Sequence, residues 1–208
     1  MSSAYKTSPM PHILDIRCPK CGGDARFEFG EVVKIKLRDD VPFFRDSHLF
    51  EYRQFIDSCG HRWHAAIYFA ALHGGSTEAI RGLPEGYQAG DWDHSKYLRW
   101  GRRNVFGAYA CRSCHDVRRH DLSWPTDAFF QIDYRGETLW AFHRESAVAL
   151  QNYIAASHRD ADTSPWSRML MHVPSHFLVA SARDAVVTRL ERLLGSERSS
   201  RKSNIAKR

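Results

Sequence analysis

Apolar residues follow two different periods along the chain, and the change falls near residue 143. Before it, short stretches alternate apolar with polar positions, as in Ala25–Phe29 and Val33–Leu37. Such alternation predicts half-buried β-strands. Trp63–Leu72 is apolar almost throughout and also predicts a strand, whereas residues 39–58 mix aspartates with aromatic residues and indicate no single element.

Residues 129–142 predict a β-hairpin. Phe130, Ile132 and Tyr134 alternate with polar residues, and an apolar pair returns at Leu139-Trp140. Arg135-Gly136 lies between the two stretches and supplies the glycine that a tight turn favours.

After residue 143 the apolar spacing becomes helical. Residues 145–157 carry one apolar stripe, and Ser164-Pro165 is a typical helix start, leading to a short helix through Met171. Ala180–Leu194 places its valines and leucines on one face, and Gly195 predicts the helix end. We therefore expect an α+β fold, in which antiparallel hairpins carry a C-terminal helical segment packed on them.

This change of period suggests four segments. Residues 1–12 are polar and predict a flexible N-terminus, and residues 13–142 form the β-rich region. Residues 143–195 form a helical segment of the same globular body, and residues 196–208 are a basic tail whose composition predicts disorder.

Two Cys-x-x-Cys pairs change the picture from fold to chemistry. The first is Cys18-Pro19-Lys20-Cys21-Gly22-Gly23 and the second is Cys111-Arg112-Ser113-Cys114. Each spacing is that of a zinc knuckle, a tight turn that directs two thiolates toward one point. Residues 22–110 separate the pairs and can fold back to bring them together. We predict a Zn²⁺ site with the ligands Cys18, Cys21, Cys111 and Cys114.

The motif and its flanking strands resemble the zinc-ribbon superfamily, including the transcription-factor type. The resemblance rests on CPKCGG and on the strand–CRSC–strand unit that ends in Val117–Leu122. The spacer here is much longer than is usual, and His115 stands where glycine commonly follows the second knuckle. The chain is also similar to bacterial zinc-ribbon proteins without an assigned activity, through Leu122-Ser123-Trp124-Pro125 and Leu139-Trp140-Ala141-Phe142.

The fifth cysteine leaves the ligand set open. Cys59 and His61 form a Cys-x-His pair, which can serve as half a zinc site. Cys18 and Cys21 can join either the second knuckle or this pair, and two zinc ions are a third arrangement. The four-cysteine set joins the two knuckles to each other and leaves Cys59 free.

A closed four-thiolate site has no open coordination position, so it stabilises the fold rather than activating water. We therefore expect a non-enzymatic binding protein. One alternative is a zinc-containing enzyme of nuclease or hydrolase type, and another is a protein-binding adaptor. The active site of such an enzyme would lie around His61, His64, Asp91, Asp93 and His94.

Charge suggests the partner. The chain has a net charge of +6, most of it in the basic tail. Arginines interleaved with Trp100 and Tyr109 flank the second knuckle, and this mixture suits phosphate contact and base stacking. We expect nucleic acid, or a protein of a nucleic-acid-handling complex, as the partner. The expected contact residues are Arg102, Arg103, Arg112, Arg118 and Arg119.

The sequence also indicates where in the cell the protein is found. Residues 1–15 lack the apolar core of a secretion signal, and no apolar run is long enough to span a membrane. We expect a cytoplasmic protein, in which cysteines stay reduced and bind metal rather than form disulfides.

Overall fold

The computed structural model describes residues 10–57, 59–92 and 105–205, with the backbone alone for residues 196–205. Mixed helices and antiparallel sheets make it an α+β fold with a C-terminal helix, as predicted. The chain divides into two compact units. Unit 1 contains the described residues up to Arg26, then Cys111–Cys114, then Ser123 onward; unit 2 contains Phe27–Ala110 and His115–Leu122.

Four strands form one sheet in the order β1-β2-β6-β7, in which β6 and β7 pair antiparallel. Its first strand buries Leu14 and Ile16 completely, and the second buries Ala25 and Phe27. The predicted strand at Ala25–Phe29 is thus confirmed. The strands are β1 (Ile13–Arg17), β2 (Asp24–Phe29), β6 (Phe106–Cys111) and β7 (Val117–Asp121).

The predicted hairpin is confirmed as β8 (Gln131–Tyr134) and β9 (Glu137–Trp140), which pair antiparallel. Its two-residue loop has positive φ at both positions, 53° at Arg135 and 81° at Gly136. Positive φ at both loop residues is the pattern of a type I′ turn, whose twist matches that of the flanking strands.

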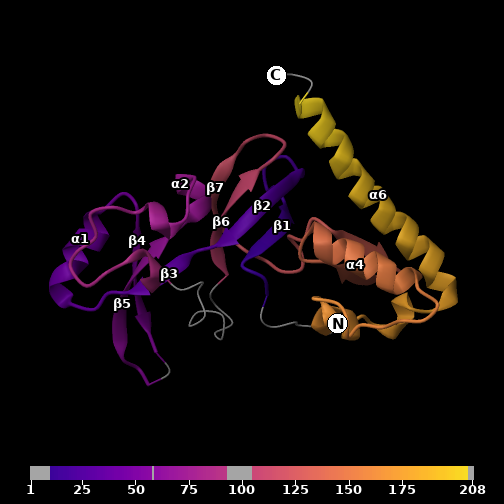
Figure 1. Cartoon of the computed structure of the whole chain (residues 1–208), viewed down its shortest axis with the longest axis horizontal. Helices are drawn as coiled ribbons and strands as arrows, with labels where there is room; N and C mark the ends of the chain where they lie inside the picture. The colour runs from indigo at the N-terminus through magenta and orange to yellow at the C-terminus, as the bar shows by residue number, and fades with distance from the viewer. Residues whose placement is uncertain (1–9, 58, 93–104, 206–208) are drawn as a thin grey trace. The chain divides into compact units, whose positions relative to one another are not determined.

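Two long helices of unit 1 lie along each other, α4 (Arg144–Ala155) and α6 (Ala180–Ile205) (Figure 1). Each buries one face, because apolar residues recur at helical spacing. The buried residues of α4 include Ala147, Leu150 and Ile154, and those of α6 are Ala182, Val186, Leu190 and Leu194.

These helices also pack on the hairpin. Tyr134 donates its hydroxyl to the backbone oxygen of Ser181 at 3.2 Å, and Phe177 is fully buried in the short helix η4 (Ser175–Phe177). The predicted packing of a helical segment on antiparallel strands therefore holds within unit 1.

Two helix boundaries differ from the predicted ones. Helix α5 (Ser167–Met171) begins after Ser164-Pro165, because the Ser164 hydroxyl accepts the Trp166 N–H at 3.1 Å in a turn before the helix. The α6 backbone continues through Gly195 to Ile205. A glycine inside a helix costs only about 1 kcal/mol relative to alanine, so it does not by itself end one.

Unit 2 contains a three-stranded antiparallel sheet in the order β3-β5-β4. Both faces are covered: Val33 and Ala66 join one apolar cluster, whereas Val32, Ala65 and Ile67 join another. The strands are β3 (Glu31–Lys34), β4 (Glu51–Ile56) and β5 (Arg62–Tyr68).

An aromatic cluster fills one side of this sheet. Phe44 is fully buried, and Phe50 stacks on Trp92 with ring centroids 5.4 Å apart. Phe44 comes from helix α1 (Val41–Asp46), which lies within the stretch whose sequence indicated no single element. Short helical turns complete the unit: η1 (Arg38–Asp40), α2 (Ala70–His73), η2 (Thr77–Ala79) and η3 (Ala89–Asp91).

Two predicted strands of unit 2 are shorter than expected. The alternation at Val33–Leu37 ends as strand at Lys34, and the Leu37 side chain is 61% exposed. The run at Trp63–Leu72 is strand only to Tyr68, after which Ala70 begins α2. Alanines tolerate helix well, so the apolar run alone does not fix where the strand ends.

Candidate metal centre

The first knuckle is the turn between β1 and β2. The Cys18 N–H donates to Gly23 O at 2.7 Å, and the Gly22 N–H donates to Cys18 O at 2.8 Å. Gly22 has a φ of 72°, which favours glycine because it has no Cβ. The turn also brings the Gly23 N–H to 3.4 Å from Cys21 Sγ. Such N–H···S contacts favour the thiolate form, which is the form that binds metal.

The second knuckle, between β6 and β7, repeats this design. The N–H groups of Ser113 and Cys114 both point at Cys111 Sγ, each at 3.3 Å. His115 follows with a φ of 59°, so it occupies the left-handed position that Gly22 occupies in the first knuckle. Histidine is among the few residues enriched in that region, which explains how it replaces the usual glycine.

The two knuckles bring four sulfurs together. Cys18 Sγ lies 3.8 Å from Cys114 Sγ, and Cys21 Sγ lies 3.6 Å from Cys111 Sγ. All four sulfurs lie within 4.8 Å of one another. Tetrahedral ligands at a Zn–S distance of 2.3 Å would be separated by about 3.8 Å. The residues present therefore fit a four-coordinate metal ion.

Burial and charge agree with that fit. Cys18 and Cys111 are buried, Cys114 is half-buried and Cys21 is exposed, and all four are free thiols rather than disulfides. The Gly23 N–H lowers the pKa of Cys21, but hydrogen bonds with the neighbouring thiols, Cys114 first, together with burial raise it to about 12. Four thiolates held this close would repel one another, because like charges repel. A divalent cation supplies the charge that stabilises four thiolates.

Arg112, inside the second knuckle, has buried partners. Its guanidinium pairs with Asp24 and lies 3.2 Å from Asp15 Oδ1, and both carboxylates are buried. Its backbone N–H donates to Asp24 O at 2.9 Å. Asp15 also accepts the Arg144 N–H at 3.0 Å, which ties the start of α4 to β1. These contacts give Arg112 a structural role, and its predicted contact with nucleic acid stays a prediction.

The other predicted contact residues divide into two groups. Arg118 and Arg119 lie on the exposed strand β7, with side chains 66% and 59% exposed. Arg118 pairs with Asp116 at 3.1 Å, and Arg119 pairs with Glu51 at 2.5 Å. Arg102 and Arg103 lie outside the described residues.

The alternative ligands Cys59 and His61 form a separate group with Asp57 at the tip of the β4–β5 hairpin. The four-cysteine cluster does not include them. Among residues 10–57, 59–92 and 105–195, these two groups are the sets of three or more side chains placed to hold a metal. Asp57 was not singled out by sequence, although its spacing of two residues from Cys59 matches that between Cys59 and His61.

The residues of the alternative enzyme site have other partners or lie outside the residues that the structure describes. His64 Nδ1 lies 2.6 Å from the Tyr52 hydroxyl, and the two rings stack. Asp91 Oδ2 accepts a hydrogen bond from Lys36 Nζ at 3.0 Å. Asp93 and His94 lie outside the described residues. The described members thus do not converge on one metal.

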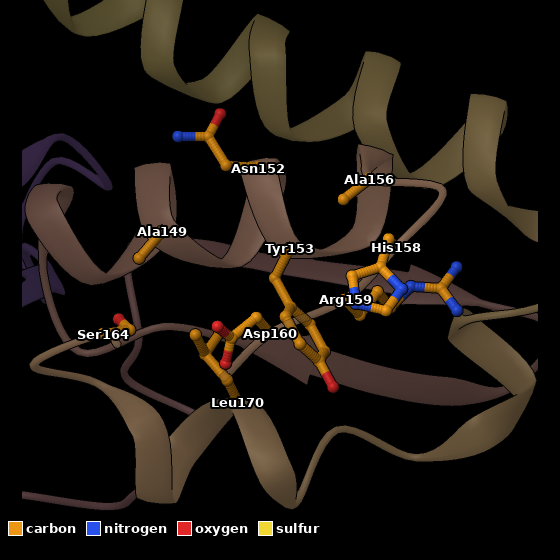
Figure 2. A pocket seen from close by; sticks show the side chains of 9 residues that line it. All are labelled: Ala149, Asn152, Tyr153, Ala156, His158, Arg159, Asp160, Ser164 and Leu170. Carbon is orange, nitrogen blue, oxygen red and sulfur yellow. The ribbon is translucent and has the colours of Figure 1, made fainter. Parts of the chain in front are cut away.

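Unit 1 also has a pocket of about 350 Å³ beside the C-terminal half of α4. Figure 2 shows Tyr153 projecting from α4 toward Leu170, with His158 and Arg159 on the loop that follows the helix. The Arg159 guanidinium already donates to the backbone oxygen of Leu178 at 2.8 Å. Sequence reasoning did not identify this pocket, because its residues carry no motif.

Comparison with protein-family models, curated proteins and solved structures finds no match to this chain. Within the described residues, no helix has both the length and the apolar character needed to cross a membrane. The four-cysteine cluster is therefore the feature that carries the functional argument.

Proposed function

We propose that the protein is a zinc-stabilised, non-enzymatic binding protein of the zinc-ribbon type. The observation that carries this proposal is the convergence of four sulfurs within 4.8 Å from two knuckles far apart in sequence. A sulfur-only tetrahedral site favours zinc or iron–sulfur chemistry. Zinc suits a folding role because it has no redox chemistry.

The ion would link two segments that lie far apart in sequence. Cys18 and Cys21 precede unit 2, whereas Cys111 and Cys114 lie between the two segments of unit 2. All four positions are protein ligands, which leaves none for a reacting water. The cluster therefore supports a scaffold and gives no support to a hydrolase.

As the partner we propose nucleic acid, or a complex that handles it, with Arg118 and Arg119 as the contact residues. Both guanidinium groups are exposed on β7, which is an edge strand of its sheet. Their partners Asp116 and Glu51 are largely buried, but a guanidinium has five donor N–H groups, so the exposed part of each arginine keeps donors for a second anion. Each arginine can thus contact a phosphate while it remains near its carboxylate.

The test is binding to single- and double-stranded DNA and RNA across a salt titration. Replacing Arg118 and Arg119 together by glutamine should weaken binding to all sequences and reduce the salt slope by about two. Arg45→Gln is the control for loss of a positive charge from the same unit, since Arg45 is exposed and pairs with the exposed Asp46 at 3.0 Å. Truncation after Gly195 measures the contribution of the basic residues beyond it, which include the end of α6.

Two results would refute the nucleic-acid partner. One is the absence of wild-type binding at about 50 mM salt, where phosphate contacts are strongest. The other is a double variant that binds as wild type does. Melting curves of the variants separate lost contact from lost folding, because Arg119 also contacts Glu51 and the ring of Phe69.

A further inference from the structure

The tip of the β4–β5 hairpin gathers three different metal-binding side chains. Asp57, Cys59 and His61 are all exposed, and a carboxylate oxygen, the thiol sulfur and an imidazole nitrogen lie within 4.8 Å of one another. All three belong to unit 2, whereas the four-cysteine cluster belongs to unit 1. Gly60, with a φ of 83°, provides the turn that lets the chain reverse between them.

The two oxygens of Asp57 have different partners. Oδ1 accepts the N–H groups of Cys59 at 2.9 Å and His61 at 2.8 Å, so it fixes the turn. Oδ2 lies 3.4 Å from His61 Nδ1. Two tetrahedral ligands at typical Zn–O and Zn–N distances of 2.0–2.2 Å would be separated by about 3.4 Å. The second oxygen and the imidazole are therefore spaced as two ligands of one ion.

A purely structural turn does not explain the whole group. The turn requires Asp57 Oδ1 and two backbone N–H groups, and none of these involves the Cys59 sulfur or the His61 ring. His64, the next histidine, has its Nδ1 at the Tyr52 hydroxyl. The side chains at the tip converge, while the histidine a few residues away does not.

From this geometry we propose a second metal site at the hairpin tip, which binds a divalent ion of the zinc class through Asp57, Cys59 and His61. The thiolate and imidazole select such borderline ions over Mg²⁺ or Ca²⁺, which prefer oxygen ligands. Three protein ligands leave one tetrahedral position to solvent. The site is therefore open and exchangeable, in contrast to the closed four-cysteine cluster.

The full chain is loaded with zinc and passed over a mild chelating resin, which removes zinc from an open site but not from the closed cluster. The experiment is then a Co²⁺ titration, followed by absorption in the visible and near-ultraviolet. Zinc in the closed cluster resists replacement because it binds more tightly than cobalt. The wild type should take up one further equivalent of Co²⁺ and show thiolate-to-cobalt charge transfer. Cys59→Ser should lose both, and His61→Ala should lose the equivalent.

Two further variants make the result specific. Asp57→Asn retains an oxygen that can accept the two backbone N–H groups but removes the anionic ligand, so it should weaken Co²⁺ binding without unfolding the hairpin. His48→Ala removes an exposed histidine of the same unit that lies outside the group, so it should bind as wild type does.

Three outcomes would overturn the proposal: no thiolate–cobalt absorption in the wild type, the same absorption in Cys59→Ser, or full uptake by His61→Ala. The zinc content before the titration reports the four-cysteine cluster by itself. A failure of that cluster is thus distinguished from a failure of the tip, which is measured by the difference between wild type and Cys59→Ser.

Discussion

Gly23 of the first knuckle faces Ser113 of the second so closely that a Cβ on Gly23 would lie 2.5 Å from Ser113 Oγ and 2.9 Å from Ser113 Cβ. It would also lie 3.3 Å from Cys21 Sγ. The two knuckles therefore pack against each other as well as share their sulfurs. Glycine at position 23 is required by this close approach.

Gly23→Ala should destabilise unit 1 by about 1–3 kcal/mol, the usual cost of overpacking, and should weaken metal retention. Urea unfolding and release of zinc to a chelator measure the two effects. Gly90→Ala is the control, because a Cβ there meets no atom within 4 Å.

Adding Ser113→Gly to Gly23→Ala should recover part of the loss, since it removes both atoms that lie under 3 Å. Additive effects of the two substitutions would show that the knuckles do not contact each other at this point.

Leu190 tests the packing of α6. Its side chain is 1% exposed, on the same helix face as Val186 and Leu194. Leu190→Asp places an unpaired charge in this interface and should destabilise the protein by several kcal/mol, about the upper range for single substitutions. Thr188→Asp, on the exposed face of the same helix, should change the melting temperature little. Equal melting of the two variants would mean that α6 does not pack through this face.

Asp91 supplies a prediction for pH. The hydrogen bond from Lys36 and the N–H of Gln88 lower the pKa of this carboxyl below its ordinary value of 3.8, against an opposing effect of burial. A folded-state pKa below the unfolded one adds stability above the unfolded value, and the addition is lost as pH falls through the folded value. Asp91→Asn should therefore cost at most about 1 kcal/mol at neutral pH, as expected for a partly exposed pair.

The difference between wild type and Asp91→Asn should shrink as pH falls below 3.8. Denaturant unfolding at neutral pH and at successively lower pH measures it, with Asp46→Asn as an exposed-carboxylate control. A difference that grows toward acid would contradict the assignment of Asp91 to a structural ion pair with Lys36.

The elements set by local pattern could be predicted from sequence. The hairpin at 131–140 has alternation and a glycine turn, and α4 has an apolar stripe of helical spacing. The cysteine cluster could also be predicted, because two Cys-x-x-Cys pairs require four converging ligands. Each of these signals lies within one short stretch of the chain or, for the cysteines, within two short motifs.

Features that depend on distant partners could not be predicted. Arg112 looked like a surface arginine until the fold placed it against Asp15 and Asp24, which flank the other knuckle. Likewise the aromatic cluster of unit 2 joins Phe44, Phe50 and Trp92 from a short helix and loops, where no period marks them. Asp57 was missed because a single carboxylate near a turn is ordinary until its neighbours are known.

Zinc content measured together with thermal unfolding, for wild type, Cys114→Ser and Cys59→Ser, tests the central claim most directly. The proteins are first passed over a mild chelating resin, which removes exchangeable metal from an open site but not from a closed one. Cys114 Sγ is one of the four converging sulfurs, and Cys59 Sγ is not. We predict one tightly held zinc ion per chain in wild type and in Cys59→Ser, and loss of both zinc and cooperative unfolding in Cys114→Ser. Full zinc content and an unchanged melting curve in Cys114→Ser would contradict the account.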